Sequence, residues 1–355
     1  MADAVTDVAS PDGVQEVAAE DIGSGTPRAV QSWSCKGAKL GEVLDALPEL
    51  RHKAGGRDSA TRTAVMTLVI VTGPDDDVGY ALSTARAIGA NHPCRLLVLR
   101  PDLDSIPVID AEAHLWRAQA PESPHPVYFE ELHMDIGGQA ASHLASIAGP
   151  FVLADLPVVI WFPSTLPDPT DPLLRLASAV FVDTRWADSS DLAHSYRALL
   201  ELANHQPVVD LSWVRLQPWR ELLAGLFEPE QTRCMLTGVR QATVLGNTSP
   251  RHMLGGWLMS QLDLRAREVS LADAKHVAIT VEASHGDEDG QFEVTRYGDS
   301  RAVWAKATLS GGMSISQALP LPDDSLTTAL AAALSNLRAD RVWERALAAA
   351  AALAS

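Results

Sequence analysis

An apolar run at residues 65–72, VMTLVIVT, constrains the fold of this chain more than any other feature. It is rich in β-branched residues, so it predicts a strand that is covered on both faces. A Gly-Pro-Asp turn and a helical stretch to about residue 90 follow, and RLLVLR at 95–100 predicts the next buried strand. A strand, a helix and a second strand in this order form a βαβ unit, which implies parallel pairing and a right-handed crossover.

The alternation of strands and helices continues to about residue 212. This rhythm is typical of an open, mostly parallel sheet in an α/β domain, which we place at residues 60–212. The further strands are expected at 111–118, 127–134, 158–162, 179–183 and 208–211, and the helices at 139–148 and 191–204, with Asp191 as the cap of the second helix.

The remainder of the chain has a different pattern and predicts an α+β domain at residues 213–355. Pro218 indicates the first position of a helix that reaches Phe227, and Ser249-Pro250 predicts a second helix with the serine as its cap. Alternating apolar residues then predict an antiparallel meander with one wet face, and a helical tail from Ser325 is expected to cover the other face. The meander strands are expected at 277–283, 292–297, 303–309 and 313–315.

Two domains also follow from the length of the chain. With 355 residues it exceeds the ~250–300 at which a single hydrophobic core stops growing. Residues 1–59 fall outside both domains. The first 32 are acidic, have no apolar period and predict a mobile tail, whereas Leu40, Val43, Leu44 and Leu47 predict one short helix.

The charge of the chain excludes two classes of partner. The formal net charge is −17, and most of it belongs to the predicted domains. A body this negative repels phosphate backbones and anionic lipids, so we expect neither nucleic-acid nor membrane-surface binding.

The cysteine content and the terminal sequence indicate a cytoplasmic protein. Cys35, Cys94 and Cys234 form an odd, sparse set without a CxxC motif, which is typical of a reducing compartment and leaves any redox role open. The acidic N-terminus lacks the features of a signal peptide, and prolines and charges interrupt the most apolar stretch.

Catalytic and cofactor motifs are not found in the sequence. The turn after residue 72 reads TGPDDDVG rather than a glycine-rich phosphate loop, and no nucleophile elbow occurs. Glu131, His133 and Asp135 share one face of an expected strand, but polar residues on the wet side of an edge strand explain them better than a metal site. Cys94 is interpreted as a small core residue. We therefore predict no enzyme, no cofactor and no metal ion.

Tryptophan and arginine cluster at the junction of the two predicted domains. Trp213, Arg215, Trp219 and Arg220 lie within eight residues, and both residue types are enriched in the energetic centres of protein interfaces. These four are the candidate partner-binding residues. In the alternative interpretation, the tryptophans fill the gap between the domains and the arginines pair with acidic residues of this chain. The sequence favours neither.

Several segments, taken in order, carry a resemblance to a known bacterial family. They are MTLVIV at 66–71, HPCR at 92–95, LPVVIWFP at 156–163, DLSW at 210–213 with WRELLA at 219–224, GWL at 256–258 and DRVW at 340–343. The chain resembles the glucose-6-phosphate dehydrogenase assembly proteins of the OpcA family from about residue 63 to 347.

The resemblance implies a non-catalytic partner that binds glucose-6-phosphate dehydrogenase and promotes its active oligomer, as an allosteric activator of the oxidative pentose phosphate pathway. It carries over no catalytic residues. An alternative from another class is an enzyme or sensor that binds a sugar phosphate or a nucleotide at the carboxyl ends of the parallel strands. That alternative requires a basic, concave pocket there, whereas the turns at these ends are acidic. A scaffold with several partners is a third possibility.

Overall fold

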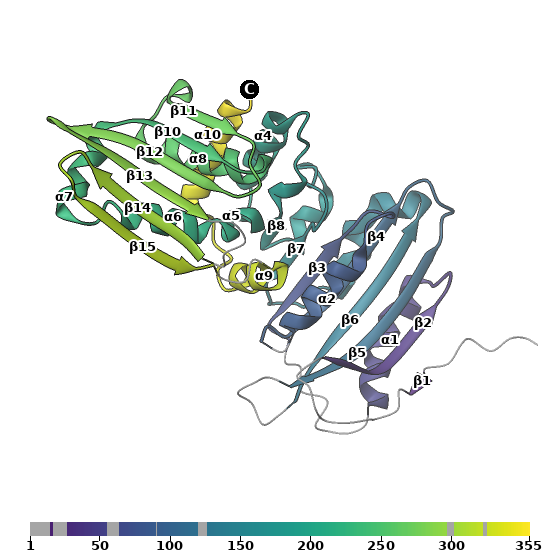
Figure 1. Ribbon diagram of the computed structural model, residues 1–355. Helices are drawn as coiled ribbons and strands as arrows, with labels where there is room; N and C mark the ends of the chain where they lie inside the picture. The colour runs from purple at the N-terminus through teal and green to yellow at the C-terminus, as the bar shows by residue number, and fades with distance from the viewer. Residues whose placement is uncertain are drawn as a thin grey trace, which may run out of the picture. The chain divides into compact units, whose positions relative to one another are not determined.

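The computed structural model describes residues 15–16, 27–54, 64–89, 91–119, 126–296, 302–321 and 325–355 (Figure 1). The chain forms two compact units. Unit 1 comprises residues 1–163 and 172–177, and unit 2 comprises residues 164–171 and 178–355. The expected acidic tail lies mostly outside the described residues, and the predicted domain boundary at residue 212 stays a prediction.

The sheet of unit 1 is built around the strand that the sequence marks most strongly. β3 (Met66–Val71) is buried at every position and pairs in parallel with β4 (Cys94–Asp102) and β7 (Val158–Trp161). β4 in turn pairs in parallel with β6 (Pro126–Gly137). β5 runs antiparallel between β6 and β2. The strands lie in the order β1 (Gln15–Glu16), β2 (Arg28–Cys35), β5 (Ile109–Gln119), β6 (Pro126–Gly137), β4 (Cys94–Asp102), β3 (Met66–Val71) and β7 (Val158–Trp161).

Helices α1 (Leu40–Lys53) and α2 (Val78–Ile88) cover opposite faces of this sheet (Figure 1). The adjacent residues Glu130 and Glu131 of β6 show this directly. Glu130 pairs with Arg51 of α1 at 3.2 Å, and Glu131 pairs with Arg86 of α2 at 2.6 Å. Because consecutive strand residues point to opposite faces, the two helices must lie on different sides.

Three expectations for unit 1 need correction. Residues 28–32 were expected in the tail but belong to β2, which pairs with β5 although its sequence, RAVQSWSC, lacks clear apolar alternation. β6 is an internal strand between β4 and β5, so Glu131 is buried rather than on the wet side of an edge. The helix expected at 139–148 is a 3₁₀ helix, Gly138–His143, followed by the short α3, Leu144–Ala148. The 3₁₀ turns Gly149–Phe151 and Pro172–Leu176 complete this unit.

Unit 2 begins with a second parallel strand pair. β8 (Ala179–Val182) and β9 (Val208–Asp210) pair in parallel and are connected through the 3₁₀ turn Thr184–Trp186 and helix α4 (Leu192–Ala203). The side chain of Asp191 accepts a hydrogen bond from the His194 backbone N–H at 3.1 Å, which confirms it as the cap of α4.

The second sheet contains the predicted meander. Neighbouring strands are antiparallel except β10 (Val239–Leu245) and β11 (Val269–Ala272), which pair in parallel and were not predicted. Alternate residues of β14 are buried and exposed, so one face is wet as expected. The strands lie in the order β11 (Val269–Ala272), β10 (Val239–Leu245), β12 (Ala278–His285), β13 (Glu288–Arg296), β14 (Ala302–Leu309) and β15 (Ser314–Pro320).

The helices of unit 2 correct two further expectations. Helices α6 (Gln217–Gly225) and α8 (Thr248–Leu262) lie against the sheet, a place that was expected for the helical tail from Ser325. The tail forms α9 (Leu326–Leu334), which packs on α5 (Leu211–Arg215), and α10 (Arg341–Leu353), which packs on α8 and α4. Helix α8 begins at Thr248 after Asn247, so Ser249 is not its cap, and its buried hydroxyl bonds to Thr184 instead. The helices are α5 (Leu211–Arg215), α6 (Gln217–Gly225), α7 (Glu230–Arg233), α8 (Thr248–Leu262), α9 (Leu326–Leu334) and α10 (Arg341–Leu353), with 3₁₀ turns at Cys234–Gly238 and Ala266–Glu268.

A glycine allows α8 and α10 to cross closely. A Cβ atom at Gly256 would lie 2.2 Å from the Ala346 carbonyl oxygen and 2.6 Å from the Ala350 nitrogen. Both atoms belong to the backbone of α10, so a side chain at this position would force the helices apart. Within the described ranges, no helix is both long and apolar enough to cross a membrane.

Candidate functional site

The predicted tryptophan-arginine segment forms a compact corner after β9. Asp210 ends β9 and caps α5, and the chain turns at Leu216 into α6. Helix α6 begins at Gln217, one residue before the predicted first position Pro218, and ends at Gly225 rather than at Phe227. Trp213 and Trp219 are both buried. The corner therefore directs its aromatic side chains into unit 2 rather than into solvent.

Arg220 stacks on Trp213 and links three helices. Its Cζ atom lies 3.5 Å from the centroid of the Trp213 ring, and its Nη2 donates to the Trp213 carbonyl oxygen at 3.2 Å. The indole Nε1 of Trp213 in turn donates to Asp340 Oδ2 at 2.8 Å, and Asp340 caps α10. Burial lowers the pKa of Arg220 to about 10, against the opposing effect of the nearby Asp340 and Glu221 carboxylates.

Arg215 pairs with an acidic residue of its own chain. Its Nη1 donates to Asp183 Oδ2 at 2.9 Å, and Arg185 Nη2 donates to the same oxygen at 2.6 Å. Ser212 Oγ donates to the other oxygen of Asp183 at 2.5 Å. For Arg215, this contact corresponds to the part of the second interpretation in which an arginine pairs with an acidic residue of the chain. Asp183 directly follows the apolar run of β8, and that position was the only signal for it in the sequence.

Asp210 is the second buried carboxylate at the ends of β8 and β9. It accepts hydrogen bonds from the backbone N–H groups of Thr184 and Ser212, from the Thr184 hydroxyl and from Trp343 Nε1, at 3.1, 3.0, 2.9 and 3.4 Å. Burial, followed by the charge of Asp183, raises the pKa of Asp210 to about 6. These bonds tie β9 to α10 and to the turn after β8.

The corner's arrangement holds helices in place rather than exposing reactive groups. Both carboxylates are buried and accept several hydrogen bonds each, and the described residues contain no group of three or more ligands that could hold a metal ion. Arg185 and Trp186, in the turn after β8, were not among the predicted site residues. Their exposures are 48% for the Arg185 side chain and 53% for Trp186, so they form the accessible edge of the corner.

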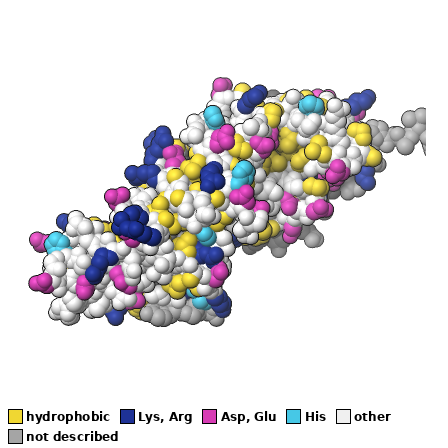
Figure 2. Space-filling model, turned by 90° about the horizontal axis from the view of Figure 1, so that it is seen from above, with side chains coloured by type: hydrophobic (Ala, Val, Ile, Leu, Met, Phe, Trp, Pro, Cys, Tyr) yellow, Lys and Arg dark blue, Asp and Glu magenta, His cyan; other side chains and the backbone are white. Residues whose placement is uncertain are grey.

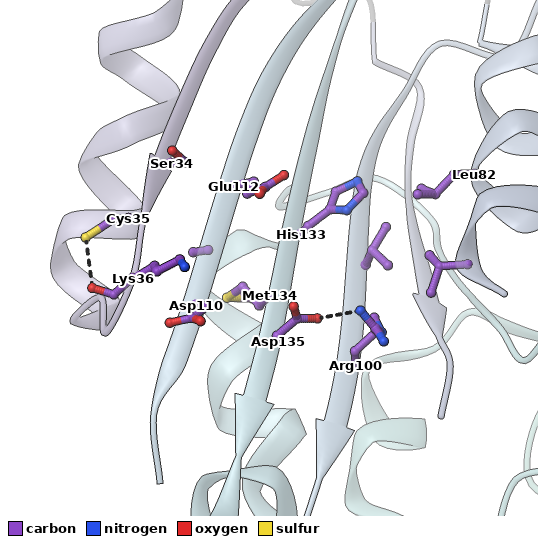
Figure 3. Close-up of a pocket in the computed structure, with 13 residues that line it drawn as sticks. Ser34, Cys35, Lys36, Leu82, Arg100, Asp110, Glu112, His133, Met134 and Asp135 are labelled. Atoms are coloured by element: carbon purple, nitrogen blue, oxygen red, sulfur yellow. Dashed lines mark hydrogen bonds and ion pairs between the residues drawn. The ribbon is translucent and has the colours of Figure 1, made fainter. Parts of the chain in front are cut away.

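Unit 1 contains a polar pocket of about 370 Å³ on the α2 face of its sheet (Figure 3). Figure 3 shows Glu112, His133 and Arg100 on three neighbouring strands, with Leu82 of α2 beside them. Arg100 pairs with Asp135 at 3.3 Å and donates to the Pro74 carbonyl oxygen at 2.6 Å. The pocket lies toward the carboxyl ends of β4 and β6, since Arg100 and Asp135 lie near those ends.

The pocket carries more carboxylates than cations. Its lining includes three carboxylates, one lysine and one arginine, so the carboxylates outnumber these two cations by one. The residues are Asp110, Glu112 and Asp135 against Lys36 and Arg100.

A buried glutamate lies next to this pocket on the same face of β6. Arg86 donates two hydrogen bonds to Glu131, at 2.7 and 2.6 Å, and the His133 ring lies 2.6 Å away. Burial alone would raise the pKa of Glu131, but the hydrogen bonds from Arg86 and His133 outweigh it and lower the pKa to about 2. The predicted shared face of Glu131, His133 and Asp135 is therefore confirmed, with Glu131 as a structural anion.

The interpretation of Cys94 as a core residue is also confirmed. The thiol is buried at the start of β4, and burial, followed by the charge of Glu131, raises its pKa to about 12. Cys35 and Cys234 are partly exposed.

Comparisons with known proteins identify the family of the chain. Residues 85–204 match the family model described as the glucose-6-phosphate dehydrogenase subunit N-terminal domain, OpcA_G6PD_assem. Residues 206–347 match the corresponding C-terminal domain model, OpcA_G6PD_C. The chain belongs to the OpcA family. The predicted resemblance is confirmed, and the two OpcA domain models adjoin at residue 205, within the connection between α4 and β9.

Three relatives named "putative OxPP cycle protein OpcA" are similar over part of their length. The protein from Synechocystis is 26% identical over 50% of this chain and 39% of its own length. The protein from Nostoc punctiforme is 24% identical over 60% of this chain and 43% of its own, and that from Synechococcus elongatus is 26% identical over 50% and 41%. These matches thus span less than half of the relatives.

Solved structures are only distantly similar. The 3-ketoreductase KijD10 from Actinomadura kijaniata has a TM-score of 0.43 at 12% identity, over 81% of this chain and 96% of its own. The transcriptional regulator Gal80p from Kluyveromyces lactis has a TM-score of 0.42 at 11% identity, over 85% and 90%. Likeness at this level carries no argument about function.

Proposed function

We propose that this OpcA-family chain binds glucose-6-phosphate dehydrogenase and promotes its active oligomeric state without catalysing a reaction itself. The observation that carries the proposal is the pair of matches to dehydrogenase-subunit domains, which together extend from residue 85 to 347. We further propose that the protein acts in the cytoplasm as an activator of the oxidative pentose phosphate pathway.

The geometry at the strand ends supports a binding role over a sugar-phosphate or nucleotide site. At the ends of β8 and β9 the carboxylates of Asp183 and Asp210 are buried and hydrogen-bonded within the chain. At the carboxyl ends of β4 and β6 the pocket has an excess of carboxylates, which repel a phosphate. The alternative function required a basic pocket at these positions.

The role of the tryptophan-arginine corner in partner binding stays a prediction. Trp213 and Trp219 are buried and the Arg215 side chain is only 14% exposed, so little of these three side chains is available for direct contact. We propose that these residues, with Arg220, act by fixing α5 and α6 in unit 2, while other surfaces contact the dehydrogenase.

Co-purification and kinetics test the proposal. Tagged chain should retain the cognate dehydrogenase on a column, and adding the purified chain should raise the rate of NADP reduction at fixed dehydrogenase concentration. The purified chain alone should not convert glucose 6-phosphate or its lactone product. Turnover by the chain alone, or an unchanged rate together with no retention, would contradict the proposed function.

A further inference from the structure

The carboxyl edge of the unit 1 sheet has an exposed apolar loop beside the polar pocket. Leu103 and Ile106 lie in the connection between β4 and β5, and they are 66% and 75% exposed. No large hydrophobic residue in the described part of the chain is more exposed than these two. Figure 2 shows hydrophobic side chains gathered beside acidic side chains on the right-hand part of that view.

Hydrogen bonds and close packing pin this loop to the end of β6. The Asp104 N–H donates to Asp102 Oδ1 at 3.0 Å, and the Gly137 N–H donates to the Val108 carbonyl oxygen at 2.8 Å. A Cβ atom at Gly137 would lie 2.0 Å from the Ile106 carbonyl oxygen, so only glycine allows this approach. These contacts fix the loop in a conformation that exposes Leu103 and Ile106. A partner can therefore contact both side chains without losing affinity to the ordering of the loop.

The adjacent pocket has the lining that a long basic side chain requires. Val78, Leu82 and Val98 supply an apolar wall for an aliphatic stem. Glu112 supplies an accessible carboxylate, since its side chain is 62% exposed. Within the described residues its ion-pair contact is to His114 at 3.8 Å, and burial lowers the pKa of His114, which favours the neutral ring.

The other carboxylates of the pocket are engaged within the chain. Asp135 pairs with Arg100, and Asp110 accepts a hydrogen bond from the Gly37 N–H at 2.8 Å. Glu112 is thus the group best placed to meet an incoming cation. A chain with a net charge of −17 also attracts basic surfaces from a distance.

We infer that this edge is a docking surface for a protein segment that inserts a lysine or arginine into the pocket and packs apolar residues on Leu103 and Ile106. The inference rests on the proposed function, because the segment belongs to glucose-6-phosphate dehydrogenase. It adds the surface used and the chemistry of the partner: a basic anchor flanked by apolar side chains.

Binding measurements on surface variants of the full chain test this inference. The double variant Leu103→Ser, Ile106→Ser should weaken binding to the dehydrogenase by tenfold or more in biolayer interferometry. Glu112→Gln should weaken it about fivefold and make the dissociation constant less sensitive to salt, because one screened charge pair is removed. The matched controls Leu319→Ser on β15 and Glu282→Gln on β12 remove an exposed leucine and an exposed glutamate elsewhere, and both should bind like the unmodified chain.

The outcomes separate the docking surface from the proposed function. If the unmodified chain does not bind the dehydrogenase, the proposed function fails and the docking surface fails with it. If it binds, but the edge variants bind equally tightly at unchanged melting temperature, the docking surface is wrong and the proposed function stands. If the double variant weakens binding while Glu112→Gln leaves both affinity and salt dependence unchanged, the basic anchor is wrong.

Discussion

Replacing Arg220 by alanine separates a structural role of the predicted corner from a role in partner contact. The substitution removes a guanidinium that stacks 3.5 Å from the Trp213 ring and donates to the Trp213 carbonyl oxygen. A cation–π contact contributes about 0.5–2 kcal/mol, and a hydrogen bond from a charged donor about 1.5–3 kcal/mol. The substitution also removes the desolvation penalty of the buried Arg220 charge, which offsets part of the stability lost with these two contacts. We expect a net loss of about 2–3 kcal/mol in the free energy of unfolding.

Thermal and urea unfolding measure this loss, and dehydrogenase activation is measured alongside at low temperature. A loss of this size should lower the melting temperature by about 5–10 °C for a unit of this length, while activation should survive wherever the variant is folded. The melting temperature of Arg220→Lys should lie between those of the unmodified protein and Arg220→Ala, because lysine keeps the charge but not the planar stacking group. The control Arg267→Ala removes a guanidinium whose side chain is 72% exposed, and we expect a change within about 0.5 kcal/mol.

The opposite pattern would refute this reasoning. If Arg220→Ala melts like the unmodified protein but no longer activates the dehydrogenase, then Arg220 contacts the partner, and the corner is an interface despite its burial.

Three further predictions follow from buried groups. Gly256→Ala should destabilise the protein by about 1–3 kcal/mol in urea unfolding, because the new Cβ atom meets the α10 backbone. The control Gly41→Ala in α1, where a new Cβ atom meets no atom of the described residues outside α1 within 4 Å, should stabilise the protein by about 0.4–1 kcal/mol. Equal effects of the two substitutions would contradict the close helix crossing. Asp210 has a folded pKa of about 6, raised above 3.8, so its contribution to stability is present below pH 3.8 and is lost as the pH rises through 6. Relative to Asp210→Asn, the unmodified protein should therefore lose up to about 3 kcal/mol between pH 4 and pH 7, and a pH-independent difference would contradict the raised pKa. Cys94 should react with a thiol reagent far more slowly than Cys35 in the folded protein, as judged by mass spectrometry of the labelled peptides, and comparable rates would show that Cys94 is accessible.

Elements with a strong apolar period could be predicted from the sequence. The uninterrupted run of β3 and the alternation in β12 to β14 appear where expected, because side-chain burial alone determines these patterns. β2, β10 and β11 were missed, since none of them has a clear apolar alternation of its own. Backbone hydrogen bonds to neighbouring strands define them, and these bonds leave little trace in the side chains.

The site was predictable only where its parts are close in sequence. The stacking of Arg220 on Trp213 joins residues seven positions apart, and the sequence brought both into one cluster. Their anchors lie much farther away: Asp183 is 32 positions from Arg215, and Asp340 is 127 positions from Trp213. The pocket likewise combines residues of β2, β4, β5, β6 and α2, so only the folded sheet brings Lys36 and Glu112 to the same cavity.

Sedimentation velocity of the dehydrogenase, with and without this chain, tests the central claim most directly when activity is measured in the same samples. We predict that adding the chain produces a heavier species containing both proteins, shifts the dehydrogenase toward its higher oligomer and raises the rate of NADP reduction in proportion to that shift. An unchanged sedimentation profile at concentrations well above those used for the assay, with an unchanged rate, would contradict the claim that this chain assembles the dehydrogenase.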